Sequence, residues 1–360
     1  MNYIFDGKSI LVTGACGTVG SELIRQLLTE PNYKPAQVVG IDSNESELFF
    51  LDQRYLSDDR ANFFVADIRE RDDLYQKMQG VDIVFHCAAL KHVILNERSP
   101  EQAVLTNILG VQNVIAAAQA CNVEKVIFTS SDKAVNPTNV MGTSKLMGER
   151  LMTAANSSKR VGGPVFASTR FGNVLGSNGS VFSIFHNQIA KGGPLTLTDL
   201  NMSRFVMSVS ESVSLLVESA MRAMGGEVFV TKMPVVRIED LARAMIKELA
   251  PLYGHTADAI EIIEIGAKPG EKLYEELMSE EETRRSLELR NYFVVLPAFK
   301  NVYSEIDYHY PDLINCNVTK PYVSSEEVPC AVDQIRELLN EYGLLDMHGD
   351  SNRASNRKGI

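Results

Sequence analysis

Short apolar runs alternate with longer segments of helical periodicity through the first half of the chain. The runs are continuous and lie at 9–13, 37–41, 62–65, 82–86, 125–129 and 165–169. Continuous runs of this length are typical of parallel strands buried on both faces of a sheet. Helices are expected between them, at 19–29, 45–55, 102–120 and 140–154. Strand followed by helix, repeated, predicts an α/β fold with a Rossmann-type doubly wound parallel sheet.

The regular alternation ends after residue 170. Gly, Ser and Asn are frequent in 172–194, which predicts irregular backbone. Further strands are expected at 227–231 and 260–265, and helices at 238–249 and 271–278. We therefore expect a Rossmann core over 1–170 and a smaller C-terminal α/β cap over 171–345 that interleaves with the core. The polar, basic residues 346–360 are expected to form a disordered tail.

Composition narrows the classes of function. Asp and Glu number 46 against 35 Lys and Arg. The resulting net charge of -11 argues against nonspecific electrostatic binding to nucleic acid or to an anionic membrane. No run reaches the length of a membrane-spanning helix, and the N-terminus lacks the features of a signal peptide, so a cytoplasmic protein without a membrane partner is expected. The five cysteines are scattered and form no CxxC pair, which predicts free thiols and no metal site.

A glycine-rich turn follows the first predicted strand. Gly14, Gly17 and Gly20 are spaced GxxGxxG and open the first predicted helix. This context suits a dinucleotide: the glycines permit a tight turn, close approach to a pyrophosphate and close helix packing, while the helix N-terminus offers N–H groups to phosphate. An ordinary glycine turn has the same spacing and remains an alternative.

Acidic residues follow the second and third predicted strands. Asp42 stands where a carboxylate binds the adenosine ribose, and Asp67 and Ile68 would lie at the adenine. Residues 43–45, directly after Asp42, include no Arg or Lys to receive a 2′-phosphate, so NAD is favoured over NADP. Asp42 as the N-cap of the next helix is the alternative.

The segment from Ser130 to Lys145, SSDKAVNPTNVMGTSK, resembles the active-site segment of extended short-chain dehydrogenases/reductases. More narrowly, it resembles that of the nucleotide-sugar 4,6-dehydratases that act on UDP-N-acetylglucosamine in polysaccharide biosynthesis. Further matches are HCAALKH at 86–92, TN at 106–107, RFGNVLGS at 170–177, MSRF at 202–205 and KPGEKL at 268–273. The resemblance covers about 5–278.

The resemblance implies a three-step reaction with retained NAD. Oxidation at sugar carbon 4 acidifies the proton on carbon 5, water is lost across carbons 5 and 6, and hydride returns to carbon 6. Elimination needs a base and an acid. The resemblance assigns Lys133 as the base, Asp132 as the acid and Ser131 as a hydroxyl donor to the oxygen on carbon 4.

One position departs from the usual Tyr-x-x-x-Lys pattern of the superfamily. Met141 stands in the place of the tyrosine, while Lys145 keeps the lysine that holds the nicotinamide ribose. A thioether cannot take a proton, so another group must accept the one on the carbon 4 hydroxyl. Our hypothesis is that Asp132, or water ordered by Ser131 and Lys133, takes this role.

The resemblance and the fold together imply two sets of binding residues. The cofactor residues would be Gly14, Gly17, Thr18, Val19, Gly20, Asp42, Ser43, Asp67, Ile68, Ala88, Ala89, Lys91, Asn107 and Lys145. The substrate residues would be Lys91, His92, Asn173, Val181, Leu195, Thr196, Arg204, Lys268 and Glu271. Lys268 stands where relatives usually have Arg, and a lysine cannot bind the substrate in the bidentate way that an arginine can.

Several functions share these features. The leading interpretation is an NAD-dependent UDP-N-acetylglucosamine 4,6-dehydratase, a lyase. The alternatives are a GDP-N-acetylglucosamine dehydratase, a dehydratase that inverts carbon 5, an NADP-dependent 4-epimerase and a non-catalytic nucleotide-sugar binding protein. A homo-oligomer is expected from the resemblance alone.

Overall fold

The computed structural model describes residues 4–177, 179–266, 270–299 and 305–345, which fall into two compact units. The first unit takes residues 4–171, 209–232 and 276–322, and the second takes 172–208, 233–275 and the described residues from Val323 onward. The second unit is narrower than the expected cap over 171–345, because 209–232 and 276–322 add helices and strands to the first unit. The predicted tail at 346–360 lies outside the described residues.

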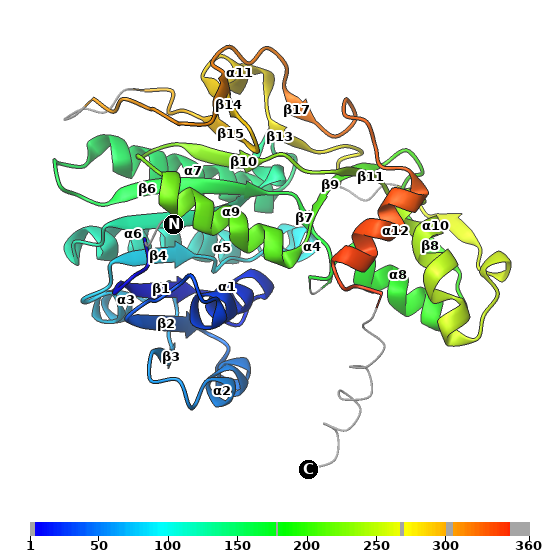
Figure 1. Ribbon diagram of the computed structural model, residues 1–360, viewed down its shortest axis with the longest axis horizontal. Helices are drawn as coiled ribbons and strands as arrows, with labels where there is room; N and C mark the ends of the chain where they lie inside the picture. The colour runs from blue at the N-terminus through cyan, green and yellow to red at the C-terminus, as the bar shows by residue number, and fades with distance from the viewer. Residues whose placement is uncertain (1–3, 178, 267–269, 300–304, 346–360) are drawn as a thin grey trace. The chain divides into compact units, whose positions relative to one another are not determined.

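Ten strands from the described part of the chain form one sheet in the first unit (Figure 1). Their order is β16-β14-β15-β10-β6-β5-β4-β1-β2-β3. The bounds are β1 (Ser9–Thr13), β2 (Gln37–Asp42), β3 (Ala61–Val65), β4 (Ile83–His86), β5 (Lys125–Ser131), β6 (Val165–Phe171), β10 (Val228–Thr231), β14 (Ser286–Leu289), β15 (Tyr292–Val295) and β16 (Leu313–Asn315).

The sheet is parallel from β3 to β10, and the three later strands join antiparallel. The six strands expected in 1–170 are confirmed within one or two residues at each end, and so is the α/β fold with a large parallel sheet. Both faces of its central strands are covered, which is why their sequences are continuously apolar.

Helices cover the two faces of the sheet. The helices of this unit are α1 (Thr18–Thr29), α2 (Glu45–Arg54), α3 (Arg71–Lys77), α4 (Val93–Arg98), α5 (Pro100–Ala103), α6 (Gly110–Ala120), α7 (Val140–Ser158), α9 (Val209–Arg222) and α11 (Glu280–Thr283), with the π-helical η1 (Val104–Leu109) and the short η2 (Asp132–Ala134). α3, α6 and α7 pack together and share a core, and α1 packs with α9.

One helical run contradicts the expectation about membrane-spanning length. α5, η1 and α6 continue into each other from Pro100 to Ala120, and this run of 21 residues is long and apolar enough to cross a bilayer by length and composition. Only 39% of its most apolar window is buried. Val104, Leu105 and Leu109 leave large apolar side chains exposed on it.

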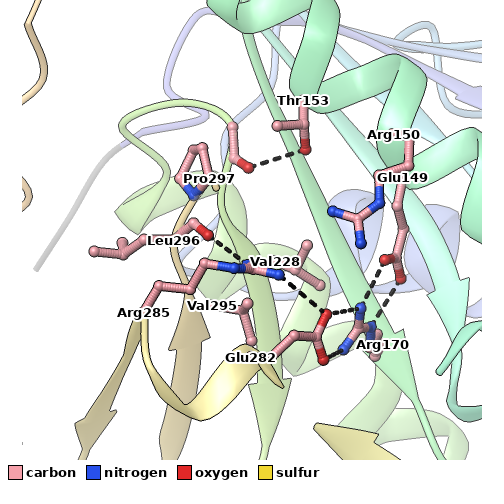
Figure 2. A pocket seen from close by; sticks show the side chains of 11 residues that line it. Glu149, Arg150, Thr153, Arg170, Val228, Glu282, Arg285, Val295, Leu296 and Pro297 are labelled. Atoms are coloured by element: carbon pink, nitrogen blue, oxygen red, sulfur yellow. Dashed lines mark hydrogen bonds and ion pairs between the residues drawn. The ribbon is translucent and has the colours of Figure 1, made fainter. Parts of the chain in front are cut away.

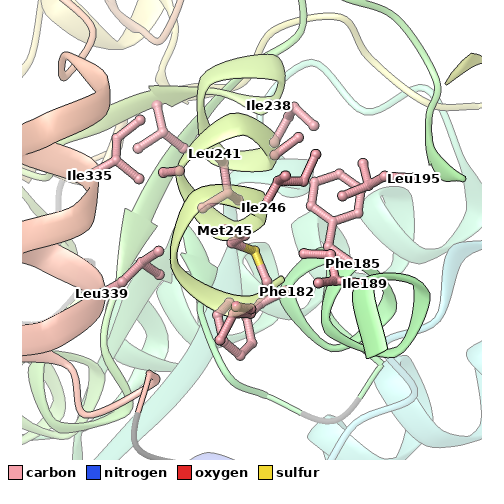
Figure 3. Packing of buried hydrophobic residues seen from close by; sticks show 14 of the residues in the cluster. Phe182, Phe185, Ile189, Leu195, Ile238, Leu241, Met245, Ile246, Ile335 and Leu339 are labelled. Carbon is pink, nitrogen blue, oxygen red and sulfur yellow. The ribbon is translucent and has the colours of Figure 1, made fainter. Parts of the chain in front are cut away.

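The second unit has its own apolar core. Its elements are β7 (Asn173–Val174), α8 (Val181–Ala190), β8 (Leu195–Leu197), β9 (Ser203–Met207), β11 (Val235–Arg237), α10 (Ile238–Leu249), η3 (Pro251–Tyr253), η4 (Ala257–Ala259), β12 (Ile262–Glu264) and α12 (Val332–Glu341). Figure 3 shows α10 between side chains of α8 and α12, with Leu241, Met245 and Ile246 in the middle of the cluster.

The expectation of irregular backbone over 172–194 is wrong in its middle. Phe182, Phe185 and Ile189 follow helical spacing and point into this core, so they form the buried face of α8. The glycines and serines that suggested a loop stand mainly on either side of the helix.

The expected helix over 271–278 is also wrong. Residues 271–275 form no helix and the last three residues form strand β13 (Glu276–Met278), where Arg170 of β6 donates to the carbonyl of Leu277. The carbonyl of Glu275 accepts from Ser324 N–H at 2.8 Å. Partners far away in the sequence therefore hold this segment extended against its helical periodicity.

Candidate functional site

The glycine turn between β1 and α1 requires at least two of its three glycines. Gly14 has φ +70°, and a Cβ there would lie 2.7 Å from the N atom of Ala88. A Cβ on Gly20 would lie 2.2 Å from the carbonyl oxygen of Gly14. No described side chain caps α1 at Gly17, and the helix begins at Thr18 with the turn folded tightly against it. This geometry suits a helix N-terminus that would bind a phosphate, and the predicted contact with a dinucleotide stays a prediction.

The Asp42 carboxylate lies beside this turn. Its Oδ2 accepts from Cys16 N–H at 3.0 Å, and its Oδ1 accepts from Asn44 N–H at 2.9 Å. Asn44, not Asp42, is the N-cap of α2, because its side chain accepts from Glu47 N–H. Asp42 thus links the glycine turn to the end of β2, which suits a carboxylate that binds a ribose. Ser43 is exposed next to it.

Other predicted cofactor residues are occupied by protein contacts. Arg69 forms an ion pair with Asp67, and its hydrogen bonds lower the pKa of this carboxyl against the opposing effect of burial. Ile68 is buried against Gly110. Asn107, in the π-helical η1, binds both backbone groups of Leu90 at 2.9 and 3.0 Å and donates to the Ser144 hydroxyl at 2.9 Å. Asn107 therefore braces the loop after β4 against α7.

Lys145 of α7 is buried beneath the end of β5. Its Nζ donates to the Thr129 carbonyl at 2.8 Å and lies 4.8 Å from the centre of the Phe128 ring. Burial lowers the pKa of Lys145 to about 8, against smaller opposite effects of Cys87 and Glu149. Burial, with a smaller contribution from Lys145, also lowers the pKa of His86 to about 3, so this imidazole is neutral at physiological pH.

The structure brings the three predicted proton-handling residues together where β5 ends. Ser131 Oγ donates to Asp132 Oδ1 at 2.6 Å, and Lys133 Nζ lies 2.9 Å from Asp132 Oδ2. The Asp132 side chain is 2% exposed and that of Lys133 32%. The cluster thus pairs a buried carboxylate with a lysine whose side chain is partly exposed. In the loop after β4, the predicted cofactor residues Ala88 and Ala89 are half-buried.

Met141 lies buried in the first turn of α7. Asn139 and Glu97 cap this turn by accepting from Gly142 N–H and Val140 N–H. A Cβ on Gly142 would lie 2.1 Å from the Lys133 carbonyl oxygen. The missing side chain therefore lets α7 rest directly on the turn that carries Asp132 and Lys133.

Several predicted substrate residues form a polar network in the second unit. Arg204 Nε lies 3.1 Å from a Glu275 carboxylate oxygen, and its other nitrogens donate to backbone carbonyls of Lys272 and Leu273. Asn173 donates to the same carboxylate at 2.7 Å. Arg204 is nearly buried and holds 272–275 in place, and its predicted contact with a diphosphate stays a prediction.

The remaining predicted substrate residues lie outside the Arg204 network. Thr196 is bound by Gln188 at both its N–H and its hydroxyl, and Val181 begins α8. The Leu195 side chain is fully buried in the core of the second unit, which leaves only its backbone for a substrate, and its predicted contact stays a prediction. Lys91, His92 and Glu271 are exposed, and burial by neighbouring atoms still lowers the pKa of Lys91. Lys268 lies outside the described residues.

Four residues that support the predicted site residues were not identified from the sequence. Glu275 and Gln188 hold predicted substrate residues from distant segments, and no local pattern marks them. Glu149 stands one helical turn after Lys145, a spacing that the sequence does show. Gly142 stands inside the motif itself, where a glycine in a helix calls for a packing reason.

Known proteins resemble this chain over most of its length. Residues 10–297 match the family described as polysaccharide biosynthesis protein. The solved structure of Pen from Bacillus thuringiensis is 39% identical with a TM-score of 0.85, and the match covers 95% of this chain and 99% of that one.

Curated relatives carry different names. A protein of Methanocaldococcus jannaschii described as an uncharacterized membrane protein is 48% identical over 81% of this chain and 87% of its own length. A UDP-N-acetylglucosamine 4,6-dehydratase (inverting) of Campylobacter jejuni is 37% identical, with 85% and 87% covered. A UDP-glucose 4-epimerase of Rickettsia conorii is 38% identical, with 81% and 83% covered. The chain therefore belongs to the polysaccharide biosynthesis protein family, among the nucleotide-sugar dehydratases and epimerases of the extended short-chain dehydrogenase/reductase superfamily.

Proposed function

We propose that this chain catalyses the 4,6-dehydration of UDP-N-acetylglucosamine to a UDP-4-keto-6-deoxy sugar. The observation that carries the proposal is the cluster of Ser131, Asp132 and Lys133, in which an acid and a base lie 2.9 Å apart at the end of β5. Loss of water across carbons 5 and 6 requires such a pair. The dehydratase of Campylobacter jejuni, at 37% identity, supports the same activity.

The hydrogen bonds of this cluster suggest a closed route for protons. Asp132 takes the proton of the carbon 4 hydroxyl, with Ser131 bridging at 2.6 Å, and Lys133, whose side chain is 32% exposed, releases its own proton to solvent. Neutral Lys133 then accepts the proton from carbon 5, while protonated Asp132 gives its proton to the departing hydroxyl. When hydride returns to carbon 6, Lys133 gives a proton to carbon 5 and regains one from solvent, which restores the ion pair. No proton transfer in this route depends on the thioether of Met141.

The cofactor of this proposal is NAD, which would accept hydride from carbon 4 and return it to carbon 6. The glycine turn and the start of α1 would hold the diphosphate, and the Lys145 ammonium would bind the nicotinamide ribose. The Asp42 carboxylate favours NAD over NADP, because it would repel a 2′-phosphate. The nucleotide released by denaturing the purified protein should be NAD, and recovery of NADP would contradict this assignment.

A 4-epimerase is the second candidate, supported by the epimerase of Rickettsia conorii. An epimerase oxidises and reduces the same carbon and eliminates no water, so it has no need of a base for carbon 5. Its product keeps the oxygen on carbon 6. The Asp132–Lys133 pair favours the dehydratase for this reason.

The test is to follow the fate of the sugar by NMR in deuterated water. UDP-N-acetylglucosamine should give a 4-keto-6-deoxy product with deuterium at carbon 5, and the configuration there distinguishes retention from inversion. GDP-N-acetylglucosamine and UDP-glucose serve as parallel substrates. A UDP-hexose epimer with an intact carbon 6 would identify an epimerase, and binding without any product would identify a non-catalytic protein.

The matched variants are Lys133→Ala and Lys77→Ala. Lys77 is paired with Asp73 on α3, away from the cluster, and its loss should leave activity unchanged. Lys133→Ala should lower kcat by about 10²–10⁴-fold. Full activity of Lys133→Ala would rule out the proposed base.

We also propose a cytoplasmic homo-oligomer. Exposed apolar side chains gather on α4 and on the helical run after it, at Ile94, Leu95, Val104, Leu105 and Leu109. A second copy of the chain would cover them without membrane insertion.

A further inference from the structure

Arg170 is the largest side chain buried completely in the described residues. It stands near the end of β6, where it pairs in register with Ser130 of β5, next to the reactive cluster. All five of its N–H groups are used: it binds Glu149 at 2.9 and 2.8 Å, Glu282 at 2.8 and 2.7 Å, and the Leu277 carbonyl at 2.9 Å. Figure 2 shows the guanidinium between the two carboxylates.

The partners of Arg170 come from three segments around the reactive cluster. Glu149 lies on α7, one turn after Lys145, and Glu282 lies on α11. Leu277 lies on β13, which contacts η2, the turn formed by Asp132 to Ala134. The neighbouring Glu276 accepts from the side chain of Asn136, two residues after that turn, at 3.0 Å. α7 also contacts η2 directly.

Burying the charges of Arg170, Glu149 and Glu282 costs desolvation free energy, so stability alone does not explain this network. Burial would raise the pKa of Glu282, but Arg170 holds it at about 2, so the carboxylate stays ionised. Apolar side chains of similar size often stabilise a fold as well as a buried ion network does. The flat, forked guanidinium, however, sets the distance and angle of two carboxylates and a carbonyl at once, which a lysine cannot do.

We propose that Arg170 is the positioning residue of the reaction centre: with Glu149, Glu282 and the Leu277 carbonyl it fixes α7 and β13 against the turn that carries Asp132 and Lys133. This rests on the proposed function for its kinetic consequence only. Arg170 itself touches no reacting group. Its loss should let the turn move relative to α7 while the folded state and sugar binding persist.

The test compares Arg170→Lys with Arg222→Lys. Arg222 of α9 also binds two carboxylates, those of Glu218 and Asp312, but it lies apart from the cluster. Arg170→Lys should lower kcat at least tenfold, with KM for the sugar within twofold of the wild type. Amide hydrogen exchange of 131–145 should rise at least fivefold. Arg222→Lys should change neither.

Two further variants keep the outcome decisive if Arg170→Lys does not fold. Glu282→Gln keeps the size of the side chain and weakens one arm of the network, and it should show the same effects in smaller measure. The triple variant R170M/E149L/E282L replaces the network by apolar groups and should fold but remain slow. A folded triple or single variant with kcat within threefold of the wild type and unchanged exchange would overturn the proposal. If the wild type makes no keto sugar, the proposed function fails, while the exchange measurement still decides the role of Arg170.

Discussion

At the scale of single residues, the proposed reaction depends on Asp132 to take the proton of the carbon 4 hydroxyl, because Met141 cannot. Asp132→Asn keeps the shape of the side chain and removes the proton acceptor, so kcat should fall by about 10²–10⁴-fold. Met141→Tyr should restore little activity to this variant, because Asp132 would still be missing for the later step. Initial rates of keto-sugar formation measure both. A strong rise in turnover from Met141→Tyr, together with full activity of Asp132→Asn, would show that the role of Asp132 is wrong.

Lys145 predicts a pH dependence of stability. Its pKa falls from 10.5 to about 8 on folding, so between these values the unfolded chain binds more protons than the folded one. Stability contributed at this site is therefore lowest below about pH 8 and rises toward pH 10.5. Relative to Lys145→Met, the wild type should gain about 3 kcal/mol over this window. Urea unfolding of both proteins at a series of pH values measures the difference, and parallel curves would contradict the shifted pKa.

Lys145 also shows what the sequence can reveal about a residue. The resemblance of Met141–Lys145 to the Tyr-x-x-x-Lys motif predicts the role of Lys145 at the nicotinamide ribose. Its contact with the Thr129 carbonyl and the lowered pKa depend on β5 and α7 meeting in the fold. The motif thus names the group, and burial sets its chemistry.

At the scale of elements, the contact between α7 and η2 depends on Gly142. An added methyl group would meet the Lys133 carbonyl oxygen at 2.1 Å, so helix and turn must separate. Gly142→Ala should lower kcat at least tenfold, although alanine favours helix formation by about 1 kcal/mol over glycine. Thr143→Ala, on the exposed side of the same turn, is the control and should retain activity. Normal turnover by Gly142→Ala would mean that this close approach does not matter.

Helices and strands with a regular local spacing of apolar residues were predictable from the sequence, and those held by partners far away in the chain were not. The strands and helices of 1–170 were found because the buried faces of a doubly wound sheet impose continuous apolar runs. β13 was mistaken for a helix because Arg170, about a hundred positions earlier, holds its Leu277 carbonyl. α8 was missed because glycines and serines around it obscured the spacing of Phe182, Phe185 and Ile189.

At the scale of the whole molecule, the exposed apolar side chains of α4 and the run from Pro100 to Ala120 predict self-association. A variant with Leu95→Glu and Leu109→Glu should lower the molar mass by light scattering from a multiple of 39.8 kDa to the monomer value. Val161→Glu, at an isolated position that is 86% exposed, is the control. A monomeric wild type would contradict the oligomer. Binding of that wild type to lipid vesicles, lost in the double variant, would identify a membrane contact instead.

The sequence by itself determined the α/β fold and the glycine turn, because these depend on the local spacing of apolar residues and of glycines. The proposed roles of Ser131, Asp132 and Lys133 came from the resemblance of a short motif and stay predictions. Only the tertiary structure decided the division into two units, the bracing role of Asn107 and the Arg170 network. In each of these, the deciding contacts join residues far apart in the chain. Their free energy arises from burial and hydrogen bonds that exist only after the sheet has formed.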